Sequence, residues 1–178
     1  MDIRRRSKFL SFILRHQPEK IGLSLDEQGW ADVTSILSGC HLSIPELLEI
    51  VEKNDKKRFE FNEDKSKIRA SQGHSIKINL GYKAQKPPDK LYHGTIRRNW
   101  ESILKDGGLK KMKRHHVHLS PDIETAIKVG GRRGKPIVIS IDSARMHSDG
   151  FVFLLSTNGV WLTDNVPKEY LDATRHIE

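Results

Sequence analysis

The sequence contains a single cysteine, Cys40, so it can form neither an internal disulfide bond nor a cysteine-based zinc cluster. It lacks an apolar run long enough to cross a membrane, and its first residues carry arginines where a secretory signal has an apolar core. With 36% hydrophobic and 30% charged residues, the composition is typical of a globular protein and not of a disordered chain. We therefore expect a cytoplasmic protein with no membrane segment.

Several common catalytic signatures are also missing. The sequence has no Gly-x-Ser-x-Gly nucleophile elbow, no Walker phosphate loop and no Gly-x-Gly-x-x-Gly dinucleotide fingerprint. The segment 130–135 (GGRRGK) is rich in glycine and basic residues, but its spacing differs from that of a phosphate loop. His115, His116 and His118 stand close together, yet successive residues of a strand face opposite sides and no carboxylate is nearby. We expect no metal site.

The positive charge of the chain is unevenly distributed. The formal net charge is +8, of which residues 81–178 carry +6, and the densest basic run is 110–116 (KKMKRHH). A basic protein favours a polyanionic partner, with nucleic acid first. A run such as 110–116 is nevertheless more often a solvated loop than a binding site.

Hydrophobic periodicity predicts a helical first part of the chain. Residues 9–14 place apolar side chains on one helical face, and Pro18 ends this pattern. Residues 30–37 are expected to form a second short helix that stops at Gly39. Residues 43–46 (SIPE) have the composition of a capping box and predict the start of a third helix.

A β-hairpin is expected after these helices. Segments 58–61 and 67–68 alternate like two strands joined by the polar turn 62–66. This places Arg69 at the end of a strand, where we expect it to face a cleft. The order of helices followed by a hairpin is that of a winged helix, a plan common among nucleic-acid-binding domains.

The polar segment 81–90 breaks both periodicities and is interpreted as a linker between two lobes, residues 1–80 and residues 91–178. The second lobe is expected to mix helices and strands, which makes the whole protein α+β. We predict strands at 91–95, 116–119, 137–141, 151–154 and 160–163, a helix at 99–105, and a helix capped by Ser120 and Pro121 that stops at Gly130.

Arginine and histidine are concentrated at the ends of the predicted segments. Arginine recognises phosphate through a bidentate fork and keeps its charge at all relevant pH values. Several such ends converging without acidic partners would suit phosphate chemistry done without a metal ion. The residues in this group are Arg15, His16, Arg69, His74, His93, Arg114, His118 and Arg132.

Five blocks of sequence together resemble one known family, the NAD-dependent RNA 2′-phosphotransferases. The blocks occur in the family's order and cover nearly the whole chain. They are 7–11 (SKFLS) with 14–16 (LRH), 68–75 (IRASQGHS), 91–95 (LYHGT), 118–120 (HLS) and 159–163 (GVWLT).

The resemblance implies an N-terminal winged-helix-like RNA lobe and a C-terminal lobe with the ADP-ribosyltransferase fold. It implies that the protein moves an internal RNA 2′-phosphate, such as that left at a tRNA splice junction, to NAD⁺. The implied route passes through RNA-2′-phospho-ADP-ribose and yields RNA with a 2′-hydroxyl, ADP-ribose 1″,2″-cyclic phosphate and nicotinamide. NAD⁺ is then a co-substrate, and 2′-phosphorylated RNA is the partner.

The resemblance also implies site residues. The family's catalytic set matches Arg15, His16, Arg69 and Arg132. At the last of these the family pattern resembles Val-Gly-x-Arg-His-Gly, whereas this chain has VGGRRG at 129–134, so Arg133 is an alternative to Arg132. The residues that would hold NAD⁺ are His93, Gly94, Thr95, His118 and Ser120.

Two other functions are compatible with the same residues. One is a mono-ADP-ribosyltransferase that modifies nucleic-acid ends or protein, which would release nicotinamide without removing phosphate from RNA. The other is an RNA-binding winged-helix protein whose second lobe binds NAD⁺ without turnover, which would release no nicotinamide. The sequence leaves open the physiological RNA, the oligomeric state, and whether His16 donates a proton or stabilises charge.

Overall fold

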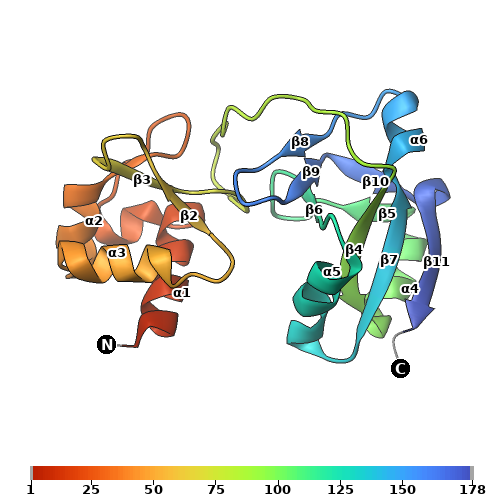
Figure 1. The fold of residues 1–178 in the computed structure, drawn as a ribbon, viewed down its shortest axis with the longest axis horizontal. Coiled ribbons are helices and arrows are strands. Elements are labelled where there is room, and N and C mark those ends of the chain that lie inside the picture. Colours follow the sequence, from red (N-terminus) through yellow and green to blue (C-terminus); the bar gives the residue numbers. More distant parts are fainter. Residues whose placement is uncertain (1, 177–178) are drawn as a thin grey trace. The chain divides into compact units, whose positions relative to one another are not determined.

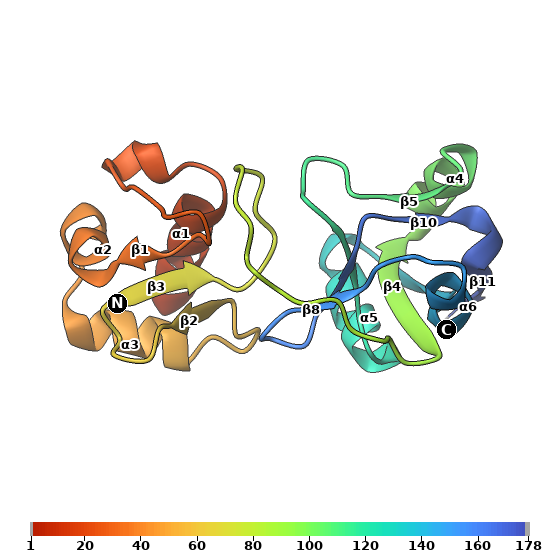
Figure 2. The same cartoon turned by 90° about the horizontal axis from the view of Figure 1, so that it is seen from above.

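The computed structural model describes residues 2–176, and for Arg133 and residues 173–176 it describes the backbone alone. The chain divides into two compact units, Met1–Gly81 and Tyr82–Glu178. Both units combine helices with small antiparallel sheets (Figures 1 and 2), so the predicted α+β class is confirmed. Among the described residues, no helix is both long and apolar enough to span a bilayer.

In its described part, the first unit is built from helices and one antiparallel sheet in the strand order β1-β3-β2 (Figure 2). Its elements are α1 (Ile3–Arg15), the 3₁₀ turn η1 (Pro18–Ile21), β1 (Ala31–Asp32), α2 (Val33–Cys40), α3 (Ile44–Glu52), β2 (Phe59–Phe61) and β3 (Lys67–Ala70).

The helix starts and the hairpin of this unit follow the sequence signals. At the start of α3, Ser43 and Glu46 form the predicted capping box, in which the Ser43 backbone N–H donates to Glu46 Oε2 at 2.8 Å. Strands β2 and β3 pair with Phe61 opposite Ile68. The predicted hairpin across 62–66 is therefore confirmed.

The predicted helix over residues 30–37 is wrong at both ends. Ala31 and Asp32 form β1, because they pair with β3 opposite Ile68 and Lys67. Helix α2 begins only at Val33 and continues through Gly39 to Cys40. Gly39 lies within the last turn of this helix and packs closely against Ile21, since a Cβ at position 39 would lie 2.9 Å from Ile21 Cδ1.

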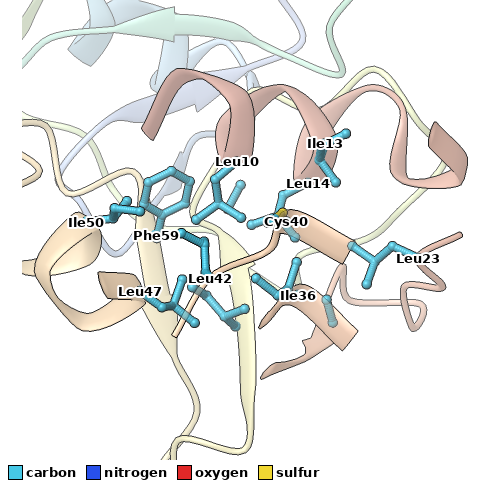
Figure 3. Packing of buried hydrophobic residues seen from close by; sticks show 13 residues of the cluster. Leu10, Ile13, Leu14, Leu23, Ile36, Cys40, Leu42, Leu47, Ile50 and Phe59 are labelled. Atoms are coloured by element: carbon cyan, nitrogen blue, oxygen red, sulfur yellow. The ribbon is translucent and has the colours of Figure 1, made fainter. Parts of the chain in front are cut away.

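One hydrophobic core holds the first unit together (Figure 3). Each fully buried leucine or isoleucine contributes about 1.5–3 kcal/mol relative to an exposed one. Because α1 supplies part of this core, its C-terminal end is fixed relative to the sheet. The labelled members of the core are Leu10, Ile13, Leu14, Leu23, Ile36, Cys40, Leu42, Leu47, Ile50 and Phe59.

The second unit contains three small antiparallel sheets with the strand orders β11-β7-β4, β6-β9-β8 and β10-β5. Its elements are β4 (Lys90–Ile96), α4 (Arg97–Lys105), β5 (Gly108–Lys110), β6 (Val117–Leu119), α5 (Ile123–Gly130), η2 (Gly131–Arg133), β7 (Pro136–Asp142), α6 (Ser143–Ser148), β8 (Leu154–Leu155), β9 (Trp161–Thr163), β10 (Asn165–Pro167), η3 (Lys168–Tyr170) and β11 (Leu171–His176).

An isolated β-bridge joins the sheet that contains β4 to the sheet that contains β6. Tyr92 N–H donates to the Ser120 carbonyl at 2.9 Å, and Ser120 N–H donates to the Tyr92 carbonyl at 2.7 Å. The prediction that Ser120 caps the following helix is therefore wrong. Asp122 caps α5 instead, because its carboxylate accepts from the Thr125 N–H at 2.7 Å.

The segment 81–90, expected to be a linker, lies mostly against the second unit. Ala84 forms a bridge with Leu154, and Gln85 N–H donates to the Phe153 carbonyl at 2.9 Å. Pro87 is buried, and β4 begins at Lys90. The boundary between the units falls between Gly81 and Tyr82.

Candidate active site

Arg15 and His16 lie at the C-terminal end of α1, where Pro18 prevents the helix from continuing. Arg15 is in the last turn, where the helix dipole favours a cation. Ser75 holds both residues. Its N–H donates to the Arg15 carbonyl at 3.0 Å, and its Oγ forms a hydrogen bond with His16 Nδ1 at 2.9 Å. The loop after β3 is thereby fastened to the end of α1.

Gly73, in the same loop, lies against the guanidinium of Arg15. Its φ of +90° is in the left-handed region, and a Cβ there would be 3.7 Å from Arg15 Cζ. A larger residue would be strained in this conformation and would cover the guanidinium. The glycine thus lets the loop pass close to Arg15 without a side chain between them.

Arg69 is buried at the centre of a network within the first unit. Its Nε donates to Glu60 Oε1 at 2.7 Å, and its Nη1 donates to the carbonyls of Gln28 (3.2 Å) and Leu80 (3.1 Å). Its guanidinium carbon lies 4.3 Å from the centre of the Trp30 ring, a cation–π distance. Only 7% of Arg69 is exposed, so these groups fix its position and Glu60 offsets part of its charge.

The surroundings of Arg15 and Arg69 are connected. The buried His74 follows Gly73, and its Nε2 lies 3.5 Å from the position that a Cβ would take at Gly29. Gly29 in turn precedes Trp30, which faces Arg69. The loop beside Arg15 and the segment that faces Arg69 therefore lie close together in the first unit.

His93, on β4, is held in one tautomer by a backbone carbonyl. A carbonyl oxygen can only accept a hydrogen bond, so Nδ1 of His93 carries the proton and donates to His118 O at 3.1 Å. Burial lowers the pKa of His93, and the nearby charge of Arg114 lowers it further, against the opposite effect of this hydrogen bond. The ring is thus neutral at physiological pH, and its Nε2 is a hydrogen-bond acceptor.

This lowered pKa predicts acid sensitivity. Below the ordinary histidine pKa of about 6.5, the unfolded chain binds a proton that folded His93 does not. The stability that the lowered pKa of His93 contributes is therefore complete above a pH of about 6.5. This stability is lost as the pH falls from there through the lowered pKa of the folded protein. We expect His93→Gln to have a smaller loss of unfolding free energy between pH 6.5 and 5 than the wild type, measured by urea unfolding. An equal slope in both proteins would contradict the assignment.

Gly94 allows helix α5 to lie directly on strand β4. A Cβ at position 94 would be 1.7 Å from the Ala126 carbonyl oxygen, and a Cβ at Gly130 would be 2.8 Å from the Thr95 nitrogen. Both positions must therefore be glycine. The role of Gly94 in binding the cofactor stays a prediction, to which the structure adds a packing role. The matching need for glycine at Gly130 was not predicted.

The close packing of α5 on β4 also positions Arg132. The turn η2, which contains Arg132, begins immediately after Gly130, at the Thr95 end of β4. Arg132 is exposed, and Thr95 is buried with its Oγ1 accepting from Asn99 Nδ2 at 3.3 Å. The alternative residue, Arg133, has a side chain outside the described part of the structure.

His118 and Ser120 lie beside His93 because Ser120 forms an isolated bridge with Tyr92 and the His118 carbonyl accepts from His93 Nδ1. Arg114 Nη1 donates to His118 Nδ1 at 3.4 Å, which makes that nitrogen an acceptor, in contrast to Nδ1 of His93. Ser120 is buried at the bridge with Tyr92. The second unit thus collects hydrogen-bonding groups around His93, with the charge of Arg114 beside them.

The predicted site residues form one group in each unit. Arg15, His16 and Arg69 belong to the first, and the residues around His93 together with Arg132 belong to the second. Ser75, which holds His16, was part of a sequence motif but was not predicted as a site residue. Within residues 2–176, no three histidine, cysteine, aspartate or glutamate side chains are grouped closely enough to hold a metal ion.

A comparison with known protein families identifies the family of this chain. The model of the family described as "RNA 2'-phosphotransferase, Tpt1 / KptA family" matches residues 2–165, which include both groups of site residues. The chain belongs to this family.

Proteins of this name from several organisms are similar to this chain along almost their whole length. A "Probable RNA 2'-phosphotransferase" of Flavobacterium johnsoniae is 57% identical over 171 residues, covering 93% of each chain. A protein of the same name from Hahella chejuensis is 51% identical and covers 95% of this chain and 93% of its own. One from Burkholderia pseudomallei is 49% identical, with 94% and 93% covered. The similarity thus extends over both units.

Proposed function

We propose that this protein is an NAD⁺-dependent RNA 2′-phosphotransferase. It moves an internal RNA 2′-phosphate, as at a tRNA splice junction, to NAD⁺ through RNA-2′-phospho-ADP-ribose. The products are RNA with a 2′-hydroxyl, ADP-ribose 1″,2″-cyclic phosphate and nicotinamide. The observation that carries this proposal is the family match over residues 2–165, which includes the Arg15–His16 pair that Ser75 holds at the end of α1.

Each unit has a proposed role. We assign the first as a winged-helix-like RNA lobe, supported by the order of helices followed by the β2–β3 hairpin, with β1 as the third strand of the sheet. We assign the second as an ADP-ribosyltransferase-like NAD⁺ lobe. Its support is the group of His93, Thr95 and Ser120, which lie together on β4 and beside it.

The chemistry of these donors and acceptors fits NAD⁺. Ribose hydroxyls and a carboxamide need neutral hydrogen-bonding partners, and His93 offers a neutral Nε2 acceptor while Thr95 and Ser120 offer hydroxyls. NAD⁺, when bound, supplies an electrophilic anomeric carbon and nicotinamide as the leaving group. His93, Thr95 and Ser120 would hold its nicotinamide riboside end, with His118 beside them.

The arginines would position the RNA phosphate. A phosphate monoester has a second pKa of about 6, so it is largely dianionic at neutral pH and needs no general base to act as a nucleophile. This agrees with the absence of a glutamate from residues 158–163. Arg15 and Arg132 would contact the phosphate, and Arg69, already held by Glu60, would contribute its remaining charge.

The second step would depend more strongly on fixed cations. Attack on the phosphate to expel the RNA 2′-oxygen gathers charge on the phosphoryl oxygens, where preorganised donors are most effective. His16 Nδ1 is bonded to Ser75, so proton exchange between His16 and the departing oxygen would pass through Nε2. The imidazole would either protonate that oxygen or stabilise the charge.

Incubation with a labelled oligonucleotide that carries one internal 2′-phosphate, with and without NAD⁺, tests the proposal. The RNA products are resolved on a gel. We expect the 2′-phosphate to be removed only when NAD⁺ is present. Phosphate removal at the same rate without NAD⁺, or no removal in either case, would refute the proposed function.

The reaction is expected to continue unchanged in EDTA. The proposed site supplies its positive charge from Arg15, Arg69 and Arg132, so a divalent cation is not needed to neutralise the phosphate. The measurement is the initial rate of NAD⁺-dependent phosphate loss with and without the chelator. A loss of activity that added Mg²⁺ restores would disprove a mechanism based on arginine alone.

RNA sequence is expected to influence turnover only weakly. Phosphate contacts by basic residues fix the position of a strand without reading its bases, and they weaken with salt. We therefore expect kcat/KM to fall with ionic strength and to differ little among oligonucleotides with different bases beside the 2′-phosphate. A variation of about a hundredfold with those bases would show direct base recognition and contradict this expectation.

A further inference from the structure

Helix α1 carries an unusual excess of positive charge outside the site. Its thirteen residues, IRRRSKFLSFILR, contain five basic side chains and no acidic one. Only Arg15, at the C-terminal end, belongs to the proposed phosphate site. The others are Arg4, Arg5, Arg6 and Lys8.

This charge is placed where helix electrostatics disfavour it. The N-terminal end of a helix bears a partial positive charge, so cations in the first turns are destabilising. Arg4 and Lys8 are also four residues apart on the helix, where like charges repel. The helix has no acidic residue in its first turn, and its N-cap Asp2 accepts from the Arg5 backbone N–H at 3.1 Å. The arrangement lowers the stability of the folded protein.

Internal contacts account for only one of these side chains. Arg6 donates from Nη1 to the Cys40 carbonyl at 3.1 Å and thus ties α1 to the end of α2. Arg4 and Lys8 are exposed, and neither forms an ion pair or a side-chain hydrogen bond with any residue in the described part of the chain. Their charges therefore have no structural role in the fold.

Arg4 and Lys8 lie on the same face of α1 as Arg15. At 3.6 residues per turn, the three side chains fall within about 40° of one another around the helix. Along the axis, Lys8 is about 10 Å and Arg4 about 16 Å from Arg15. We call Arg4, Lys8 and Arg15 the α1 basic stripe. Its outer two members are too far away to share one phosphate group with Arg15.

The loop 54–58 packs against the same helix. Asn54 Nδ2 donates to Ser7 Oγ at 2.7 Å, which fixes the loop to α1 at the residue before Lys8. Ser71 Oγ donates to the Lys57 carbonyl at 3.2 Å and thereby connects this loop to the segment that holds Arg15. Lys57 is exposed, so this loop adds a positive charge to the surface of the same unit.

We propose that the α1 basic stripe binds successive backbone phosphates of single-stranded RNA on one side of the 2′-phosphorylated nucleotide. The inference rests on the proposed function for its ligand class and extends it, because it assigns the part of the RNA beyond the reacting phosphate. A single row of cations matches one strand of phosphates. The binding of RNA phosphates to Arg4 and Lys8 then offsets the destabilisation that these cations cause near the N-terminal end of the helix.

The salt dependence of RNA binding tests the stripe without relying on turnover. The dissociation constant of a labelled single-stranded 2′-phosphorylated RNA is measured by fluorescence anisotropy, without NAD⁺, for the wild type and for Arg4→Gln/Lys8→Gln. For single strands, each phosphate contact contributes about −0.7 to the slope of the logarithm of the association constant against the logarithm of the salt concentration. The slope of the double variant should therefore be less steep than that of the wild type by about 1.4. Its affinity deficit should then shrink about sevenfold between 50 and 200 mM salt.

The matched control removes the same charge elsewhere. Lys65, in the β2–β3 turn, and Lys105, at the end of α4, are exposed and form no ion pair within residues 2–176. Lys65→Gln/Lys105→Gln should keep the wild-type slope. An equal change in both double variants would mean that only net charge matters and would overturn the proposal.

Two further measurements separate the stripe from a structural role. Since the stripe extends from Arg15 in one direction, RNA extended on only one side of the 2′-phosphate should lose affinity with Arg4→Gln/Lys8→Gln, and RNA extended on the other side should not. Arg4→Glu should raise the melting temperature by about 1–2 °C while it weakens RNA binding. An unchanged slope, or equal losses with both RNAs, would refute the proposal, even if NAD⁺-dependent phosphate removal is observed.

Discussion

Arg132→Ala is expected to make RNA-2′-phospho-ADP-ribose accumulate, because the variant should slow the second chemical step more than the first. In the first step that we propose, the phosphate would arrive already ionised, so the loss of one guanidinium should affect only its positioning. In the second step charge builds up on the phosphoryl oxygens, where a lost fixed donor costs about 3 kcal/mol, or a hundredfold and more in rate. Arg132→Lys should recover little, because an ammonium lacks the planar fork.

Arg132 tests this difference between the two chemical steps better than Arg69 does. It is exposed, and no ion pair joins it to another described residue, so its removal should leave the fold intact. Removing Arg69 would leave the carboxylate of Glu60 half-buried and unpaired, which disturbs the first unit as well as the chemistry.

The assay is a time course on labelled 2′-phosphorylated RNA with NAD⁺, in which the intermediate is resolved from substrate and product. Lys135→Ala, which removes an exposed charge close to Arg132 in the sequence, is the matched control and should behave like the wild type. If Arg132→Ala loses both steps equally and no intermediate band appears, the arginine serves substrate binding alone.

Gly94→Ala is expected to lower stability more than any surface substitution. The added Cβ would lie 1.7 Å from the Ala126 carbonyl oxygen, so α5 or β4 must move. Overpacking of this kind costs about 3 kcal/mol, which corresponds to a fall in melting temperature of about 6–12 °C for a chain of this length. Because α5 also carries the turn with Arg132, activity should fall at temperatures where the variant is still folded.

Gly131→Ala provides the control for this substitution. Gly131 follows Gly130 at the end of α5 and has an αR conformation, and a Cβ there would meet Pro136 at ordinary distances, 3.8 Å to Cγ and 4.0 Å to Cδ. We expect its melting temperature to equal or slightly exceed that of the wild type. A melting temperature for Gly94→Ala within 2 °C of that for Gly131→Ala would contradict the packing role of Gly94.

Local signals in the sequence predicted the local structure well. The end of α1 before Pro18, the capping box of Ser43 and Glu46, and the β2–β3 hairpin depend on residues that are close in the chain, and they were found as expected. These features are set by backbone conformational limits and short-range hydrogen bonds. They need no knowledge of tertiary packing.

Features that depend on distant partners were predicted less well. Ala31 and Asp32 are strand residues because β3 lies beside them, although their own sequence favours a helix. Strand β10 was missed because its pairing is with β5, in which Asn165 lies opposite Lys110. In both cases tertiary hydrogen bonds override local preference.

The same distinction holds for the candidate site. The motif residues Arg15 and His16 could be selected from the sequence, but the contact that orients His16 comes from Ser75, 59 residues away. Gly94 was predicted from the sequence as a cofactor residue, and its packing role was not predicted. Its role depends on the carbonyl of Ala126, which no local pattern reveals.

The stoichiometry of nicotinamide release tests the proposed function most directly. The wild-type protein is incubated with 2′-phosphorylated RNA and NAD⁺, and both the nicotinamide released and the 2′-phosphate lost from the RNA are counted over time. The proposed transfer predicts one nicotinamide for each phosphate removed and no inorganic phosphate. Nicotinamide release without phosphate loss would indicate ADP-ribosyl transfer alone, and phosphate loss without nicotinamide would indicate simple hydrolysis; either result would contradict the transfer of phosphate to NAD⁺.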